Sequence, residues 1–85
     1  MEIEFTFDAQ KQLEEWKKSG NKQVQKKITE LIASISDTPF AGIGKPEALK
    51  YNWTGFWSRR INDEHRIVYQ VLEYKIIIVQ LKYHY

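Results

Sequence analysis

The sequence predicts an α+β fold in which one strand and a pair of helices precede a small antiparallel sheet. Apolar and polar residues alternate at the start of the chain, apolar residues then recur at helical spacing through two consecutive segments, and three strand-like runs follow a glycine-containing loop. The chain has 85 residues, which is enough for one hydrophobic core and too little for two. We therefore expect a single domain over residues 1–85.

A period of two predicts the first strand. Ile3, Phe5 and Phe7 alternate with polar residues, as in a strand with one buried face. Asp8 is expected to cap the helix that follows, and this helix should continue to about Ser19. Its apolar residues recur at helical spacing: Ala9, Leu13 and Trp16.

A helix stop and a new helix cap stand side by side at Gly20 and Asn21. The second helix is expected to end at Thr38, because a residue before a proline disfavours the helical conformation. It carries a regular apolar stripe: Val24, Ile28, Leu31, Ile32 and Ile35. The short connection predicts that the two helices pack as an antiparallel pair.

The segment 40–50, FAGIGKPEALK, has no sustained period and is predicted to be an ordered loop, a kind of segment that often carries function. Three strands are expected after it, at about Gly55 to Ile61, His65 to Val71 and Lys75 to Tyr83. The gaps between them suit antiparallel hairpins. The last run begins with apolar residues on both faces, which predicts a central strand covered by helices on at least one side.

Composition argues against several classes of protein. The chain has no cysteine, which excludes disulfides, a Cys-type zinc site and a thiolate nucleophile. Its two histidines, His65 and His84, are not at zinc-ligand spacing, and no phosphate-binding glycine motif is present, so neither a metal nor a cofactor is expected. There is no signal-peptide pattern and no apolar run near the roughly 20 residues of a membrane span. We therefore expect a cytoplasmic protein without membrane contact.

Positive charge gathers in the middle of the chain, although the net charge is only +2. All three arginines lie between positions 59 and 66. A guanidinium can bind two phosphate oxygens at once, so this stretch is a candidate phosphate-binding region. The alternative is a solvated polar pair of strands.

Acid–base candidates accompany these cations. Glu47 lies on the predicted loop and His84 near the end of the chain. RNA can be cut without a metal if a base removes the proton of a 2′-hydroxyl, cations stabilise the phosphate charge and an acid protonates the leaving oxygen. With ordinary pKa values of about 4.3 and about 6.5, a glutamate is ionised and a histidine partly protonated near neutrality, as a base and an acid require.

Each of these residues also has an ordinary explanation. Glu47 can be a surface carboxylate paired with a nearby lysine, and Arg66 a solvent-facing strand residue. His84 gains little by packing near an ordered chain end, yet it can still be structural. Tyr85 fits packing as well as stacking on an RNA base.

Residues 38–71, TPFAGIGKPEALKYNWTGFWSRRINDEHRIVYQV, and the terminal KYHY at 82–85 resemble the signature of the YoeB (Txe) toxins of the RelE-like superfamily. The resemblance implies a RelE-like fold, in which two helices pack on a small antiparallel sheet. It also implies a toxin of a type II toxin–antitoxin system, an endoribonuclease that cuts mRNA on translating ribosomes and is silenced by a cognate YefM-like antitoxin. Ala48 departs from the family pattern, which often has a second proline there, and this leaves the stiffness of the loop open.

The resemblance implies a role for each candidate residue. Glu47 of the G-K-P-E segment is the general base, and Arg66 of E-H-R stabilises the phosphate. In the terminal Y-H-Y, His84 is the general acid and Tyr85 helps to orient the substrate. Four further basic positions match residues that contact RNA or the ribosome: Lys45, Lys50, Arg59 and Arg60.

Two other functions remain open. A toxin of this fold that does not cut RNA, as the gyrase-poisoning ParE relatives are, would not need Glu47 and His84 together. A non-catalytic RNA-binding or partner-binding module would use the basic and aromatic residues for affinity alone. The expected partners are the antitoxin and the mRNA-bearing ribosome, with a homodimer as a further possibility.

Overall fold

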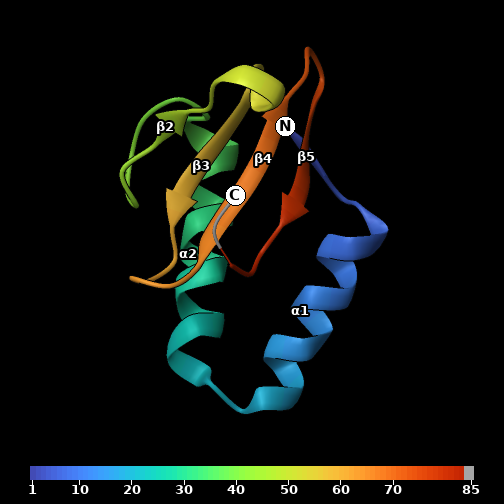
Figure 1. Cartoon of the computed structure of the whole chain (residues 1–85), viewed down its shortest axis with the longest axis vertical. Helices are drawn as coiled ribbons and strands as arrows, with labels where there is room; N and C mark the ends of the chain where they lie inside the picture. The colour runs from blue at the N-terminus through green and yellow to red at the C-terminus, as the bar shows by residue number, and fades with distance from the viewer. Residues whose placement is uncertain (84–85) are drawn as a thin grey trace.

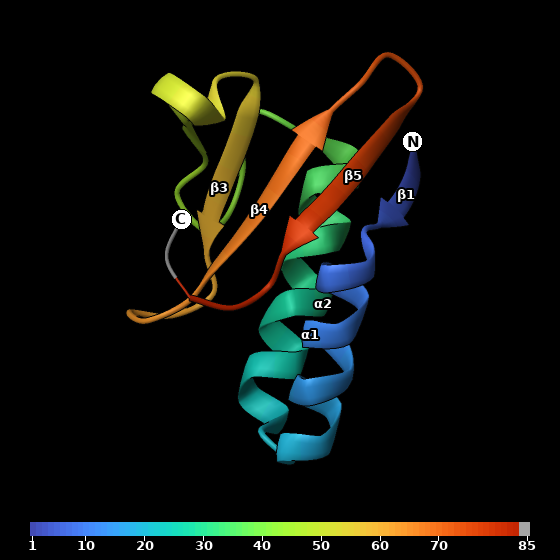
Figure 2. The same cartoon turned by 45° about the vertical axis from the view of Figure 1, so that its right-hand side comes forward.

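The computed structural model describes residues 1–83 and consists of two helices packed on one mixed sheet (Figure 1). The sheet order is β1-β5-β4-β3-β2, with β1 parallel to β5 and the other neighbours antiparallel. Both helices lie on the same side of the sheet (Figure 2). The elements in chain order are β1 (Glu2–Phe5), α1 (Phe7–Ser19), α2 (Lys22–Asp37), β2 (Glu47–Ala48), the 3₁₀ turn η1 (Tyr51–Trp53), β3 (Phe56–Arg60), β4 (Arg66–Val71) and β5 (Lys75–Gln80). The predicted α+β fold is confirmed.

The start of α1 differs from the prediction. Thr6, not Asp8, is the cap: its hydroxyl accepts a 3.1 Å hydrogen bond from the backbone N–H of Ala9. Asp8 instead lies in the first turn, where a negative charge still favours the helix N-terminus. The strand alternation therefore stops at Phe5, and Phe7 begins the helix with its ring 84% exposed.

The boundary between the two helices is as predicted. Gly20 ends α1 in the left-handed conformation, with φ of 72°, which glycine adopts without steric cost. Asn21 then caps α2 by accepting a 3.1 Å hydrogen bond from the Val24 N–H. The apolar stripe of α2 faces the sheet and is buried at Val24, Ile28, Leu31 and Ile35.

The three predicted strands form the antiparallel part of the sheet, and β5 is central, between β1 and β4. It ends at Gln80 rather than Tyr83, because the N–H and the carbonyl of Leu81 bind side chains of α1 instead of a neighbouring strand. One strand lies within the predicted loop. This is β2, whose two residues pair with the outer edge of β3.

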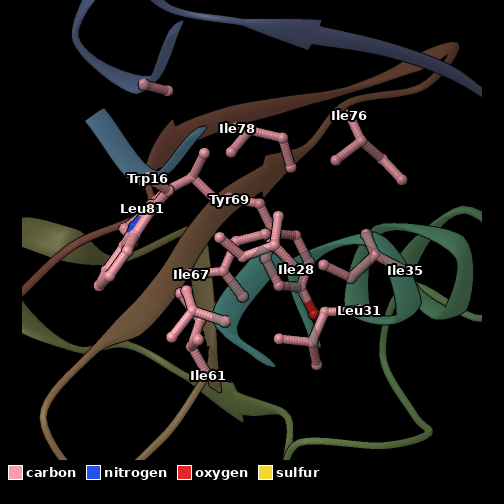
Figure 3. Close-up of a cluster of buried hydrophobic side chains, with 12 residues drawn as sticks. Trp16, Ile28, Leu31, Ile35, Ile61, Ile67, Tyr69, Ile76, Ile78 and Leu81 are labelled. Carbon is pink, nitrogen blue, oxygen red and sulfur yellow. The ribbon is translucent and has the colours of Figure 1, made fainter. Parts of the chain in front are cut away.

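The core lies between the helices and the sheet, and Figure 3 shows its side chains converging from α1, α2, β4 and β5. Burying each large aliphatic or aromatic side chain contributes about 1.5–3 kcal/mol, before the entropy of ordering it is counted. The labelled members are Trp16, Ile28, Leu31, Ile35, Ile61, Ile67, Tyr69, Ile76, Ile78 and Leu81.

Candidate active site

The face of the sheet opposite the helices carries three of the predicted site residues. Directly paired residues on neighbouring strands share a face, as do residues two apart on one strand. Glu47 pairs with Ser58, which is two residues from Arg60, and Arg60 pairs with Arg66. The core residues Ile67 and Tyr69 alternate with Arg66 on β4 and face the helices. The fold therefore brings Glu47, Arg60 and Arg66 to one face, which the helices leave open.

Arg60 and Arg66 are directly opposite each other at the ends of β3 and β4. Like charges in this position destabilise a strand pair unless an anion lies between or near them. Within residues 1–83, neither arginine takes part in an ion pair, and the Arg66 guanidinium makes one 3.4 Å contact to the carbonyl of Asn62. Two guanidinium groups so placed are suited to the oxygens of a phosphate.

The chain returns to this pair of arginines after β5. The backbone N–H of Arg66 donates a 3.0 Å hydrogen bond to the carbonyl of Tyr83. Tyr83 directly precedes His84 in the sequence. The predicted acid and orienting residue, His84 and Tyr85, lie outside the described residues, but the residue that leads into them is held at the start of β4.

A hollow of about 350 Å³ adjoins Glu47 and is lined by the continuous segment from Glu47 to Trp53. Lys50 contributes a cation to it, and Tyr51 an aromatic ring that is 91% exposed. Tyr51 has φ of 57° and Lys45 has φ of 53°, a conformation that non-glycine residues rarely adopt. Backbone strain therefore stands on both sides of Glu47, and such strain is concentrated at functional sites in proteins.

Sequence reasoning did not select Tyr51. The signal available was an aromatic residue next to a lysine on a polar loop, but that pattern equally describes a ring that packs inward. Only its exposure in the structure makes it a candidate to stack on a base.

The predicted role of Arg59 as an RNA or ribosome contact is wrong. Its side chain is fully buried on the helix-covered face, because consecutive residues of a strand point to opposite sides of the sheet. Every donor nitrogen of the guanidinium is engaged within the protein. The acceptors are the Tyr69 hydroxyl at 3.0 Å, the Ser34 hydroxyl at 2.7 Å and the carbonyls of Thr38, Ala41 and Ile43 at 2.7, 2.8 and 3.2 Å.

Arg59 instead ties the loop before β2 to the sheet and to α2. The next residue continues this attachment, because the Arg60 N–H donates a 2.7 Å hydrogen bond to the Gly44 carbonyl. Burial raises the pKa of Tyr69, and the hydrogen bond from Arg59 opposes that rise. The loop that leads to Glu47 is thus ordered by a buried cation, in addition to the packing of Phe40 on Trp57 at 5.0 Å between ring centroids.

The described part of the chain offers no cluster of three metal-ligating side chains among its His, Asp and Glu residues. None of its helices is long and apolar enough to span a membrane. Among the described residues, the candidate site holds the Glu47 carboxylate and the guanidinium groups of Arg60 and Arg66.

Comparison with known proteins places this chain in a family. The family model described as "YoeB-like toxin of bacterial type II toxin-antitoxin system" matches residues 5–85. Toxin YoeB of Streptomyces coelicolor is 47% identical over 85 residues, which cover the whole of both chains.

Solved structures agree with the sequence match. The YoeB/ParE toxin from Agrobacterium tumefaciens superposes with a TM-score of 0.95 at 39% identity, covering all of both chains. Two structures of YoeB from Staphylococcus aureus, a dimer and a complex with YefM, superpose with TM-scores of 0.88 and 0.87 at 45% and 46% identity, each covering all of this chain and 98% of the other. The expected RelE-like fold is confirmed, and the chain belongs to the YoeB-like toxins of bacterial type II toxin–antitoxin systems.

Proposed function

We propose that this toxin is a ribosome-dependent mRNA endoribonuclease that acts by metal-independent acid–base chemistry. The observation that carries the proposal is the hydrogen bond between the Arg66 N–H and the Tyr83 carbonyl. It brings the residue before His84 to the pair of arginines, on the face that also carries Glu47. The proposed base and the two cations thus lie on one face of the sheet, and the residue that precedes the proposed acid is hydrogen-bonded beside the arginines.

In the proposed mechanism, each of these groups has one role. The Glu47 carboxylate takes the proton of a 2′-hydroxyl, and the 2′-oxygen attacks the adjacent phosphorus. Arg66 and Arg60 stabilise the charge that develops on the phosphate oxygens. His84 protonates the leaving 5′-oxygen, which gives a 2′,3′-cyclic phosphate and a 5′-hydroxyl, while Tyr85 orients the substrate.

The RNA strand would run past the hollow beside Glu47. Lys45 and Lys50 are exposed cations on either side of Glu47 and would bind the backbone. The exposed ring of Tyr51 would stack on a base next to the cut.

The partners follow from the family and from the charge of the site. A YefM-like antitoxin is the expected partner, since the Staphylococcus aureus YoeB forms a complex with YefM. An acidic segment that folds on binding would suit the basic face of this toxin. The mRNA-bearing ribosome, in the cytoplasm, would be the target. A homodimer is consistent with the Staphylococcus aureus dimer.

Cleavage of ribosome-bound mRNA tests the proposal. Glu47→Ala and His84→Gln should each lower the cleavage rate by on the order of 100-fold or more, with ribosome binding nearly unchanged. A 2′-deoxy nucleotide at the cut site should stop cleavage by the parent protein, since the attacking oxygen is gone. Glu73→Ala, an exposed acidic residue on the far hairpin, is the matched control. Retention of cleavage by both site variants would overturn the assignment.

Metal dependence is tested separately. Cleavage should survive EDTA on ribosomes kept intact by polyamines, because a carboxylate and an imidazole supply both proton transfers. The proposed chemistry would be contradicted if EDTA abolished cleavage and added Mg²⁺ restored it while the ribosomes stayed intact throughout.

A further inference from the structure

The three residues after β5, Leu81 to Tyr83, are held by groups far away in sequence. Leu81 is fully buried, and both of its backbone groups bind α1. Its N–H donates to Gln12 Oε1 at 2.6 Å, and its carbonyl accepts from Trp16 Nε1 at 2.8 Å. Gln12 and Trp16 lie one helical turn apart, so a single face of α1 satisfies both groups.

The next residue, Lys82, also contacts α1. Lys82 Nζ lies 5.1 Å from the centroid of the Trp16 ring and 3.5 Å from Glu15 Oε1. The Glu15 side chain is about half exposed, so that ion pair adds little stability. The Trp16 ring beside Lys82 is 7% exposed and part of the core, so it gives Lys82 a fixed neighbour.

Tyr83 is held by two hydrogen bonds of its backbone. Its N–H donates to Nδ1 of His65 at 2.8 Å, and its carbonyl accepts from the Arg66 N–H at 3.0 Å. Its φ is 64°, a left-handed conformation that costs a non-glycine residue about 1–2 kcal/mol. The residue is 62% exposed, and its ring lies 5.9 Å from the His65 ring between centroids and 5.8 Å from Lys82 Nζ. The hydrogen bonds therefore maintain a strained turn just before His84.

His65 links this turn to α1. Its ring packs edge-on against Trp16 at 4.9 Å between centroids, and its side chain is 15% exposed. Because the Tyr83 N–H donates to Nδ1, that nitrogen carries no proton and the neutral ring is protonated at Nε2. His65 therefore serves as a hydrogen-bond acceptor fixed by an aromatic contact.

We propose that Gln12, Trp16 and His65, here called the C-terminal clamp, are positioning residues that set the direction of the backbone leading into His84. The inference rests on the proposed role of His84 as the general acid. An acid must lie within hydrogen-bond distance of the leaving oxygen, and a displacement of about 1 Å can cost on the order of 100-fold in rate. The clamp acts on catalysis through Tyr83 and touches no substrate.

Two substitutions of His65 separate positioning from packing. His65→Phe keeps a ring against Trp16 and removes the acceptor, whereas His65→Asn places Oδ1 where Nδ1 stands. We expect H65F to lower kcat by about 10-fold or more with KM nearly unchanged, and H65N to recover most of that loss. If His65 were purely structural, the kcat values of the two variants would instead vary with their thermal stabilities.

A double-mutant cycle shows whether the clamp acts through His84. In a His84→Gln background, H65F should cause no further loss, because the group that it positions is already gone. The same fold loss in both backgrounds, or cleavage by H65F equal to that of the parent, would overturn the proposal.

Gln12 provides a second route should H65F fail to fold. Gln12→Leu removes the acceptor for the Leu81 N–H, whereas Gln12→Glu retains one, so only Q12L should lower kcat. Amide hydrogen exchange gives a readout apart from cleavage: the Tyr83 N–H should exchange about 10-fold faster or more in H65F than in H65N. Equal exchange rates of the Tyr83 N–H in H65F and H65N would refute the clamp. This readout does not depend on cleavage, so it tests the clamp even if His84→Gln cleaves normally and the proposed nuclease function is wrong.

Discussion

Arg59 and Tyr69 form a buried relay on neighbouring strands: Arg59 Nε donates a 3.0 Å hydrogen bond to the Tyr69 hydroxyl, which donates in turn to the Pro39 carbonyl at 2.7 Å. Within residues 1–83, the partners of this cation are neutral oxygens, and no carboxylate pairs with it. A buried charge without such partners would be very costly. The chain therefore surrounds Arg59 with hydroxyl and carbonyl acceptors, most of them from one loop.

Replacing Arg59 should first unfold the loop before β2, which supplies carbonyl acceptors to Arg59. Arg59→Met keeps much of the volume but leaves several buried oxygens without a donor, and we expect a loss of about 3 kcal/mol or more in the free energy of unfolding. Urea denaturation measures it. Arg60→Met is the control, since Arg60 is exposed and the substitution should cost about 0.5 kcal/mol or less. Equal losses in the two variants would contradict the buried role of Arg59.

Tyr69 should make stability depend on alkaline pH. Burial raises the pKa of Tyr69 above the ordinary value of 10.0, so between these two values the unfolded chain loses the proton that the folded chain keeps. The contribution of Tyr69 is fully present below pH 10 and declines as the pH rises towards its higher folded-state pKa. Tyr69→Phe should cost about 1–3 kcal/mol at neutral pH, because Arg59 Nε loses its acceptor. The free energy of unfolding of Tyr69→Phe should also fall less steeply above pH 10 than that of the parent. If the two plots of this free energy against pH ran parallel, the link between stability and the titration of Tyr69 would be refuted.

Gly44 and Gly55 both have positive φ but differ in the space around them, so substitutions at these two positions can be compared. A Cβ added to Gly44 would lie 2.6 Å from Cδ2 of Leu31, whereas one added to Gly55 would meet nothing within 4 Å. Gly55→Ala should cost only the backbone strain of about 1–2 kcal/mol, and Gly44→Ala a further 1–3 kcal/mol or so from overpacking against α2. Thermal unfolding of both variants measures the difference between their losses of stability. Equal losses would show that the loop before β2 can move away from α2.

Tyr51 should contribute to substrate binding if it stacks on a base. Tyr51→Ala should raise KM by about 10-fold, in line with about 1–3 kcal/mol per stacked base, and leave kcat nearly unchanged. Tyr51→Phe should retain the parent KM. The control is Tyr74→Ala, a 78% exposed tyrosine between β4 and β5. A similar change in KM for the alanine variants of Tyr51 and Tyr74 would exclude a specific contact.

Local pattern was enough to predict most elements of the fold. The stripe of α2 and the Gly20–Asn21 boundary depend on residues within a few positions of one another, and both predictions are confirmed. The cap at Thr6 was missed because Asp8 is an equally good capping residue by type, and only the end of β1 decides between them. The pairing of β1 with β5 joins the two ends of the chain, and no local period reports it.

The site was less accessible to sequence reasoning. The outward position of Glu47 depends on the register of β2, a strand of two residues that sits inside what reads as a loop. Arg59 and Arg60 were assigned the same role, although alternation along β3 allows only one of them to face outward. His65 gave no signal at all, because its acceptor role exists only once Tyr83 has folded back against it.

The central position of β5 bears on when this toxin can become toxic. A ribosome makes β5 after every other described strand and helix, yet β1 and the clamp residues of α1 have their partners in β5 and just beyond it. A nascent chain that stops before Lys75 lacks the middle of its sheet and cannot complete its core. The order of synthesis thus delays the assembly of the face that carries Glu47, Arg60 and Arg66 until β5 has been made.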